Sequence, residues 1–369
     1  MRDDLIRLSG EPLPISFTRA RRTYTGGKLL EELHGYAEPR DSFYPEEWVG
    51  SVVQARGTGR GDEGLSDILL EDGSSVLLKD LIHFAPDLFL GPGHVRRYGE
   101  NPAMLVKLID SAERLSVQVH PDRAFARAAF GSEFGKAESW YVLGTRKVSG
   151  LDPYLLIGFK PWVTRDLWED LIESQDISAM LDCLHRVSPA PGDVYRIGGG
   201  LPHAIGPGCF LIEIQEPTDY TLRAEMASPH GDPFPEMLIH QGIGRERLLD
   251  CFHYDTGTLE ETMARCRVAP AVTDSQPGGI RRDLTGPGAS EFFSMAGIDV
   301  TGQYVCDAGD TYSLLIVLSG TGTLSWSGGS RLLNASSRLF LPFGMRGCTL
   351  TNTCGPDAPL RAVLCYPPA

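Results

Sequence analysis

The sequence predicts a mainly β protein, and two observations support this prediction. The 369 residues include 42 glycines and 26 prolines, which are spread along the chain rather than clustered. This composition favours short strands joined by many turns over a helical bundle or a disordered tail. Several stretches also alternate apolar and polar residues with the period of two that is typical of β-strands.

The stretch 116–122, with the sequence SVQVHPD, is the most informative of these predicted strands. Its two valines share one face, which leaves Ser116, Gln118 and His120 on the other. Pro121 cannot extend a central ladder, so we expect the strand to end just past the histidine, near a rim. An amide and an imidazole side by side at a strand rim form half of a plausible metal site.

Two further segments are candidates for the other half of this site. Residues 135–143 are predicted to be a turn entering a strand, with Glu138 at its start. Residues 191–205 are predicted to be a strand, a glycine-rich turn and a second strand, and the glycines could present His203 at a tight bend. Nitrogen and oxygen ligands of this kind suit zinc or another divalent transition metal.

These segments resemble type I mannose-6-phosphate isomerases. The runs 113–122, 135–138, 201–204 and 211–219 follow that family's order, and the similarity is sharp over residues 101–223. The resemblance implies a cupin-type jelly-roll barrel, to which the residue patterns add inserted helices and a second, smaller jelly-roll domain. It also implies one Zn²⁺ per chain, with the ligands Gln118, His120, Glu138 and His203.

The resemblance further implies an aldose–ketose isomerase that interconverts mannose 6-phosphate and fructose 6-phosphate through an enediol. Such a reaction needs a Lewis acid for the enediolate oxygen and a base close to the carbon-bound hydrogen. Glu213 is the candidate base, because its predicted strand turns it away from its apolar neighbours. Arg223 matches a family arginine implicated in catalysis, and Lys136, two residues before Glu138, should lie near the metal.

Three more residues are expected to contact the substrate: Lys107, Ser116 and Asp219. Lys107 is flanked by apolar residues, an expensive position for a charge without a partner. We expect the short connection 110–114 to pair its strand with that of Ser116 as a hairpin. The segment 224–232 departs from the family's pattern, which leaves the phosphate contacts and the exact sugar open. His230 in this segment is either a replacement contact or an ordinary loop histidine.

Two domains are expected, a zinc-binding catalytic domain at 1–255 and a C-terminal jelly roll at 256–369. An amphipathic helical insertion around residues 162–187 should cover one end of the catalytic barrel. Further helices are predicted in the latter part of 75–90 and around 235–251.

The C-terminal domain is predicted to hold no metal. Its stretches 311–324 and 338–350 should form paired strands. Cupins commonly place a metal-binding histidine after the proline and glycine that follow such a strand. Gly347 stands at this position, so a structural role is expected for the domain.

Charge and cysteine content restrict the partners. The chain carries 34 Lys and Arg against 48 Asp and Glu, a formal net charge of −14, which argues against nucleic acid or anionic membrane as a partner. A phosphate-ester substrate would therefore need local positive charge.

The eight cysteines form no CxxC pair, as expected for thiols in a reducing cytoplasm. No apolar run approaches the roughly 20 residues of a membrane span, and the charged N-terminus does not resemble a signal peptide. The oligomeric state is left open.

Two other functions remain as alternatives. One is a cupin oxygenase with iron at the same ligands, although a glutamine ligand is unusual for that class. The other is a non-catalytic protein that binds a sugar phosphate. The retention of Lys136, Glu213 and Arg223 beside the ligands argues against such a loss of turnover.

Overall fold

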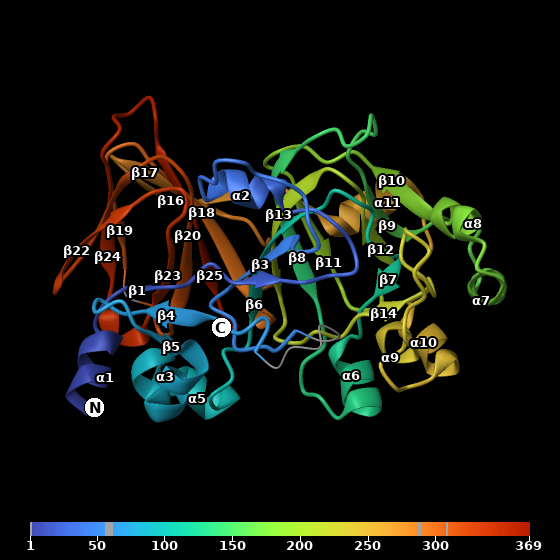
Figure 1. Cartoon of the computed structure of the whole chain (residues 1–369), viewed down its shortest axis with the longest axis horizontal. Helices are drawn as coiled ribbons and strands as arrows, with labels where there is room; N and C mark the ends of the chain where they lie inside the picture. The colour runs from blue at the N-terminus through green and yellow to red at the C-terminus, as the bar shows by residue number, and fades with distance from the viewer. Residues whose placement is uncertain (1, 56–61, 287–288, 308) are drawn as a thin grey trace.

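The chain folds into two β-sandwiches that lie side by side (Figure 1). The computed structural model describes residues 2–55, 62–286, 289–307 and 309–369. All named strand pairs are antiparallel, and strands dominate both halves. The prediction of a mainly β protein is therefore confirmed.

The N-terminal sandwich consists of a seven-stranded sheet and a five-stranded sheet. In spatial order, the larger sheet contains β15 (Arg267–Val268), β11 (Val194–Ile197), β8 (Glu138–Thr145), β13 (Cys209–Gln215), β6 (Leu105–Asp110), β3 (Glu46–Val49) and β2 (Arg19–Ala20). The smaller sheet contains β10 (Leu184–Val187), β9 (Leu155–Phe159), β12 (His203–Ile205), β7 (Gln118–Val119) and β14 (Leu222–Arg223).

The C-terminal sandwich has a seven-stranded and a four-stranded sheet. The first contains β1 (Leu13–Pro14), β23 (Arg338–Leu341), β20 (Ser313–Ser319), β25 (Leu360–Tyr366), β18 (Ser294–Val300), β17 (Gly279–Asp283) and β16 (Ala271–Gln276). The second contains β19 (Gln303–Cys306), β24 (Cys348–Asn352), β21 (Gly322–Trp326) and β22 (Gly329–Leu333). The predicted strands of this half do pair, β20 with β23 and β21 with β24.

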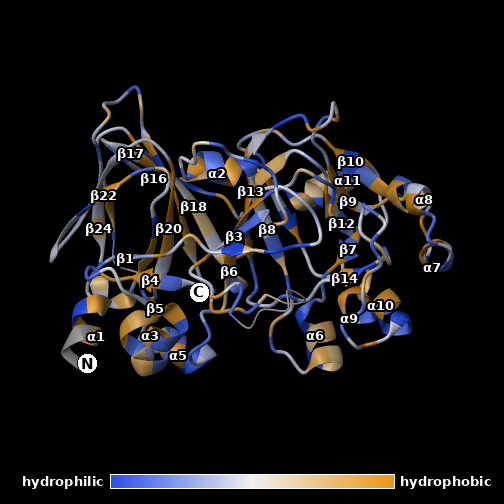
Figure 2. Cartoon of the chain, in the orientation of Figure 1, coloured by the Kyte–Doolittle hydropathy of each residue, from blue (hydrophilic) through white to orange (hydrophobic). Residues whose placement is uncertain are grey.

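The two sandwiches pack against each other through their seven-stranded sheets. Val106 and Ile212 from β6 and β13 share one buried cluster with Leu314, Ile316 and Val363 from β20 and β25. Figure 2 shows β20 as hydrophobic, in contrast to the hydrophilic β3. Because side chains alternate along a strand, the remaining face of β6 and β13 points into the N-terminal sandwich. The contact between the sandwiches thus fixes which residues of these strands can line a site.

Segments of each half complete the sheets of the other. Near the N-terminus, β1 pairs with β23, while β15 pairs with β11 and follows helix α11 (Leu259–Cys266). The domain boundary at residue 255 stays a prediction. Strand β1 precedes it but joins the C-terminal sandwich, and strand β15 follows it but joins the N-terminal sandwich. A separate two-stranded sheet is formed by β4 (Asp67–Leu69) and β5 (Ser75–Leu77).

Short helices surround the sandwiches at their ends (Figure 1). The helices predicted within residues 75–90 are α3 (Leu78–Phe84) and α4 (Pro86–Phe89). The others are α1 (Arg2–Ser9), α2 (Lys28–Leu33), α5 (Pro92–Tyr98), α6 (Arg123–Phe130), α7 (Arg165–Ser174), α8 (Ile177–Asp182), α9 (Glu236–Ile239) and α10 (Arg245–Cys251), with the 3₁₀ turns η1 (Ala289–Glu291) and η2 (Phe343–Met345). In the described part of the chain, no helix is long and apolar enough to span a membrane.

Two predicted helices are shorter than expected. The insertion at 162–187 breaks at Gln175, whose φ of 54° ends α7, and residues 184–187 form strand β10 rather than helix. The predicted helix at 235–251 is split into α9 and α10 because Gly242 and Gly244 adopt positive φ between them.

The predicted hairpin between the strands of Lys107 and Ser116 is wrong. Lys107 lies on β6 in the seven-stranded sheet, whereas Ser116 leads into β7 in the five-stranded sheet. The connection crosses between the sheets, and Leu115 donates its backbone N–H to Ile205 of β12. Strand β7 pairs instead with β12 and β14. Lys107 and Ser116 therefore approach each other across the sandwich, not along a hairpin.

Candidate active site

One wall of the site is a row of three side chains on the five-stranded sheet. Strand β7 lies between β12 and β14, and Gln118 is directly opposite His203 on one side and Arg223 on the other. Directly opposed residues of an antiparallel pair project from the same face. Amide, imidazole and guanidinium thus stand side by side, although they come from positions far apart in the sequence.

The facing wall is a second row on the seven-stranded sheet. Register pairs join Trp140 to Glu213, Glu213 to Lys107 and Lys107 to Trp48 across four neighbouring strands. The indole N–H of Trp140 donates to carboxylate oxygens of both Glu138 and Glu213, at 3.0 Å each. This bridge holds the two buried carboxylates in one orientation. As predicted, Glu213 points away from its apolar neighbours, which face the C-terminal sandwich.

His120, Glu138 and His203 meet between these walls. One ligand atom from each residue can be chosen so that all three lie within 4.8 Å of one another, and all three side chains are buried. The Gln118 amide lies 3.3 Å from Nε2 of His203. The four residues predicted as ligands are therefore brought together by two sheets and the loops that follow β7 and precede β12.

Both imidazoles are held in the form that can bind a metal through Nε2. Nδ1 of His120 is 2.7 Å from the carbonyl oxygen of Tyr220, and Nδ1 of His203 is 2.9 Å from that of Leu201. Because a carbonyl only accepts, each Nδ1 carries the proton and each Nε2 keeps its lone pair. Burial, with the charge of Lys136, lowers the pKa of His120 to about 3, and burial lowers the pKa of His203. Both rings are neutral near pH 7.

The surroundings of Glu138 favour a bound cation. Its Oε1 lies 3.0 Å from Nε2 of His120, and both atoms are electron-rich. The ammonium of Lys136 lies 3.0 Å from Oε1 and donates to Nε2 of His120 at 3.1 Å. Burial would raise the pKa of Glu138, but the charge of Lys136 and the contacts with His120 and His203 together outweigh it and hold that pKa well below 4.5. An ionised carboxylate with two neutral imidazoles is a donor set that fits a divalent metal ion.

A close backbone approach brings the loop of His203 to the loop of His120. A Cβ at Gly199 would lie only 2.5 Å from backbone atoms of Asp122. Only glycine fits there, and the adjacent Gly200 donates its N–H to the carbonyl of His120 at 2.7 Å. The glycine-rich turn therefore positions the two histidines relative to each other.

Glu213 and Lys107 form a buried ion pair at the back of the site. Their charged atoms are 3.1 Å apart, and both side chains are almost fully buried. Burial first, and the negative charge of Glu138 second, raise the pKa of Glu213 to about 7. Burial acts to lower the pKa of Lys107, but Glu213 and Glu46 outweigh it and raise that pKa. Glu213 can therefore gain or lose a proton near neutrality.

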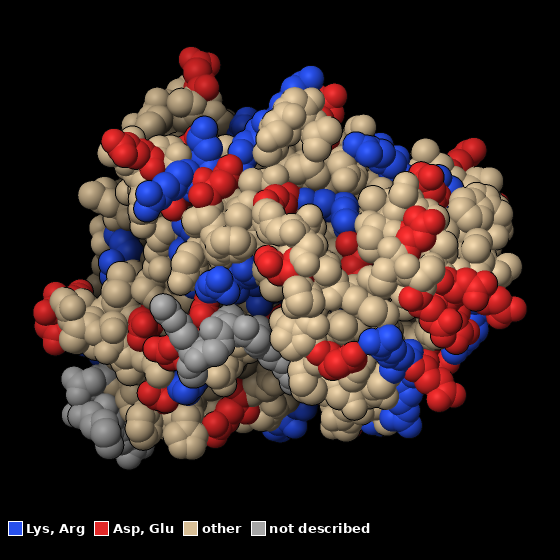
Figure 3. All heavy atoms as spheres, turned by 45° about the vertical axis from the view of Figure 1, so that its right-hand side comes forward, with Lys and Arg blue, Asp and Glu red and all other residues tan. Residues whose placement is uncertain are grey.

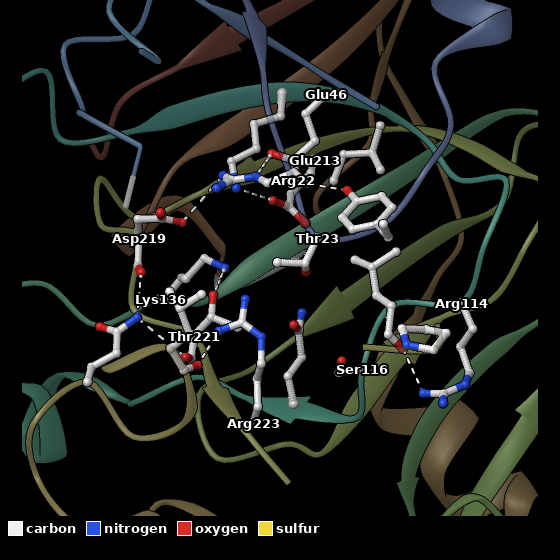
Figure 4. A pocket seen from close by; sticks show the side chains of 18 residues that line it. Arg22, Thr23, Glu46, Arg114, Ser116, Lys136, Glu213, Asp219, Thr221 and Arg223 are labelled. Carbon is white, nitrogen blue, oxygen red and sulfur yellow. Dashed lines mark hydrogen bonds and ion pairs between the residues drawn. The ribbon is translucent and has the colours of Figure 1, made fainter. Parts of the chain in front are cut away.

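A pocket opens in front of these groups and carries more positive than negative charge (Figure 4). Its lining includes five cationic side chains, Arg22, Lys107, Arg114, Lys136 and Arg223, and three carboxylates, Glu46, Glu213 and Asp219. Predicted substrate contact Ser116 also lines it. Among the described residues, Arg223 forms no ion pair with a carboxylate, and its guanidinium donates to the carbonyl of Leu238. It is the cation most available to an anionic ligand.

Comparisons with known proteins find relatives that match nearly the whole chain. A probable mannose-6-phosphate isomerase of Bacillus subtilis is 28% identical over 330 residues, 89% of this chain and 93% of that protein. The mannose-6-phosphate isomerase of Streptococcus mutans is 27% identical over 341 residues, 90% of this chain and 92% of that protein. Over nearly its whole length, the chain is thus similar to proteins named mannose-6-phosphate isomerase.

Solved structures of this family share the fold. The mannose 6-phosphate isomerase from Bacillus subtilis matches with a TM-score of 0.73 at 20% identity, over 96% of this chain and 99% of that one. A phosphomannose isomerase mutant from Salmonella typhimurium matches with a TM-score of 0.72 at 15% identity, over 97% of this chain and all (100%) of that one. The cupin-type fold implied by the sequence resemblance is thus confirmed. No protein-family profile matches the chain.

The sequence analysis missed several residues of the pocket, among them Arg22, Tyr24 and Glu46. Nε of Arg22 lies 2.9 Å from Glu46, and its Nη2 lies 3.6 Å from Asp219. The hydroxyl of Tyr24 donates to Glu46 at 2.7 Å. These residues precede the family-like region and lie on or near very short strands, where no periodicity distinguishes them. Their charges could have been noticed, but not their location.

The segment that departs from the family's pattern lies at the edge of the pocket. Pro229 lines the pocket, whereas His230 is not part of the lining. Nε2 of His230 lies 2.8 Å from a carboxylate oxygen of Glu113, and the histidine is exposed. This arrangement favours the ordinary loop histidine over the replacement contact.

Proposed function

We propose that this protein is a zinc-dependent isomerase that interconverts mannose 6-phosphate and fructose 6-phosphate through an enediol. The observation that carries the proposal is the buried His120–Glu138–His203 cluster beside a pocket with excess positive charge. The similar proteins from Bacillus subtilis and Streptococcus mutans bear the name of this activity.

One Zn²⁺ would be held by His120, Glu138, His203 and Gln118. Neutral Nε2 atoms and an ionised carboxylate favour such binding, and the carbonyl partners of the Nδ1 atoms fix the rings. When bound, the ion supplies Lewis acidity to the oxygens of the carbons that exchange a proton. The Lys136 ammonium, 3.0 Å from Glu138, would remain close to the reacting oxygens and add positive charge there.

The remaining cations suit a phosphate ester. Figure 3 shows basic side chains recessed in a hollow near the middle of one face, while acidic side chains gather toward the right-hand end. A dianionic ligand therefore meets local positive charge in a protein whose net charge is −14. Arg223 can bind a phosphate or the developing enediolate bidentately, since its guanidinium has no carboxylate partner among the described residues. Ser116 and Lys107 line the same pocket and would orient the sugar.

Glu213 would move the proton between the two carbons. A group with a pKa of about 7 is well matched to general acid–base catalysis near neutral pH. The Trp140 N–H fixes one of its oxygens, and Lys107 lies 3.1 Å from the other. The carboxylate would take the proton from one carbon and return it to its neighbour, so it ends each turnover in its starting state.

Cytoplasmic residence is part of the proposal. Its support is that all eight cysteines are free thiols, as expected in a reducing compartment. The partner would be a small sugar phosphate, with neither nucleic acid nor membrane involved.

The decisive experiment is an isomerase assay on metal-free protein, repeated after stoichiometric Zn²⁺ is added. We expect no turnover without metal and conversion of mannose 6-phosphate to fructose 6-phosphate with it, and no conversion of unphosphorylated mannose. Turnover in D₂O should place solvent deuterium on the product carbon, as an enediol requires. Oxygen consumption with iron instead would favour an oxygenase. Tight binding of the sugar phosphate without turnover would favour the non-catalytic alternative.

A further inference from the structure

Two cysteines of the C-terminal sandwich lie directly opposite each other on neighbouring strands. Cys306 ends β19, and its register partner on β24 is Cys348. Both are free thiols. Neither residue belongs to the active site or to the contact between the sandwiches, where a different cluster lies.

The two side chains share the inner face of the sandwich. Cys348 belongs to a buried cluster with Tyr304 and Leu350, and Cys306 packs against that cluster. Tyr304 and Leu350 are the next register pair on the same face. Cys306 remains partly exposed, whereas Cys348 is buried. A small solute can therefore reach the pair from the side of Cys306.

The backbone around the pair defines its geometry. Val305 directs its N–H and its carbonyl to the side chain of Gln276, away from β24. Neighbouring residues of a strand direct these groups to opposite sides, so Cys306 and Cys348 form a hydrogen-bonded pair. In such pairs the Cα atoms are about 5.5 Å apart, within the range that a disulfide spans. Their Cβ atoms are about 5 Å apart, about 1 Å more than a disulfide prefers.

We propose that Cys306 and Cys348 are a redox modification site that forms a reversible cross-strand disulfide when a peroxide is present. The sulfur of one cysteine attacks the peroxide, which forms an S–O bond, breaks the O–O bond and releases water. The second sulfur then attacks the first, the S–O bond breaks and a second water leaves. The two thiols lose two electrons in total, and one hydrogen peroxide is reduced to two waters.

Cys348 is suited to react first. The adjacent Cys306 side chain lowers the pKa of Cys348 below its ordinary value of 9.0 and so favours its thiolate. Desolvation by burial raises the pKa of the thiols of Cys209 and Cys365, which have no such partner. Thiolates, not thiols, are the reactive species. The pair therefore combines an activated sulfur with an adjacent resolving thiol.

The disulfide should be easily reduced again. Closing the Cβ atoms by about 1 Å requires β19 to shift, which strains the bond and raises its reduction potential. Such a shift is feasible because β19 is the edge strand of its sheet. A strained bond of this kind suits a labile modification rather than a permanent crosslink.

The test uses the full chain with Cys354→Ser, which removes an exposed thiol that could react by itself. After brief treatment with hydrogen peroxide, we expect the free thiol count to fall by two, and proteolysis with mass spectrometry should find Cys306 linked to Cys348. Dithiothreitol should restore both thiols. Cys306→Ser in the same background serves as the matched control, because it keeps Cys348 but should stop at a sulfenic acid that a dimedone probe traps.

Two outcomes would overturn the proposal. One is a pair that stays reduced under peroxide concentrations that fully oxidise Cys354 in the otherwise unchanged chain. The other is oxidation of Cys348 to the same sulfenic acid in both the variant and the parent protein, without a link to Cys306. The thiol count and the search for the Cys306–Cys348 link are both made on the Cys354→Ser protein. The test therefore does not depend on the folding of the Cys306 variant.

Discussion

Glu46 and Glu47 are neighbours on β3, yet they bind arginines on opposite sides of the sheet. Glu46 faces the active-site pocket and lies 2.9 Å from Arg22. Glu47 faces the C-terminal sandwich, where Nε of Arg338 on β23 lies 3.1 Å away and both side chains are about 1% exposed. The strand thus links the wall of the site to the packing of the second sandwich.

Breaking the Glu47–Arg338 pair should be costly. Arg338→Met leaves the Glu47 carboxylate buried without its arginine, and the contact that remains is to His34, at 3.1 Å. Removal of one partner of a buried pair typically costs about 3–5 kcal/mol, and we expect a loss of this size in the free energy of unfolding. Chemical denaturation measures it. The matched control is the double variant Glu47→Leu with Arg338→Met, which should recover most of the loss. Equal instability of both variants would show that the pair itself is not the cause.

The metal site should bind one ion per chain. His203→Ala removes one of the three clustered ligands, so zinc content and turnover should both fall below detection while the β-rich circular dichroism spectrum persists. Elemental analysis of the parent protein should find one zinc. His230→Ala is the matched control, since His230 is exposed and does not line the pocket. Stoichiometric metal in His203→Ala would remove that residue from the site.

A second ion would contradict the prediction for the C-terminal half. Gly347 stands where the resemblance to cupins would place a histidine, and its φ of 100° favours glycine there. We therefore expect the C-terminal sandwich to contribute no metal. Two tightly bound ions per chain, one of them retained in His203→Ala, would be the contrary result.

Glu213 should make the stability of the metal-free protein depend on pH. Its pKa is about 7 in the folded chain against 4.5 ordinarily, so the folded state binds the proton more tightly. This contribution to stability is complete below pH 4.5 and is lost as the pH rises to about 7. The side chain in Glu213→Gln cannot ionise, so the variant does not lose this contribution. As the pH increases from 4.5 to about 7, the variant should therefore become more stable relative to the parent. Denaturation curves at about pH 5 and pH 8 measure this difference.

Bound zinc provides the control for the pH prediction. A nearby cation favours the ionised carboxylate, so zinc should shrink the pH-dependent difference between the parent and Glu213→Gln. The contrary result is a difference in free energy of unfolding between the parent and Glu213→Gln that does not change with pH in the metal-free protein. The carboxylate would then ionise at its ordinary pKa and would not be tuned to act as a base near neutral pH.

Much of the site could be predicted from the sequence because its ligands sit next to local features. Gln118 and His120 alternate on a strand that ends at a proline, and His203 follows three glycines. Arg22 and Glu46 could not be found this way, because their place depends on the pairing of β3 with β6. The hairpin of Lys107 and Ser116 failed for the same reason. A five-residue connection at 110–114 can turn within a sheet or cross to the opposite one, and only tertiary packing decides which.

The boundaries of the elements show the same limit. Hydrophobic periodicity continues from α7 through α8 into β10, since the buried side of all three packs on one cluster that includes Trp168, Met180 and Leu184. The break at Gln175 is stabilised by contacts from another part of the chain, because its amide donates to the carbonyl of Ala224 at 3.0 Å. No local pattern encodes that partner, so the sequence predicted one continuous helix.

Arg223 should act mainly on turnover. It lies beside Gln118 in the row that contains His203, and no carboxylate among the described residues pairs with it. Loss of one preorganised donor that stabilises developing charge typically costs about 10²–10³-fold in kcat, which we expect for Arg223→Ala. Zinc should remain bound. The lost hydrogen bond to Leu238 should cost only about 1 kcal/mol of stability.

Arg223→Lys is the matched variant for this position. It keeps the positive charge but lacks the planar fork of the guanidinium, so it should recover kcat only in part. Steady-state kinetics and thermal denaturation of both variants separate the two roles that Arg223 could have. A wild-type kcat in Arg223→Ala together with a large loss of stability would make Arg223 a structural residue that anchors Leu238. If Arg223→Lys restored full turnover, Arg223 would contribute only its positive charge, and bidentate binding would play no part.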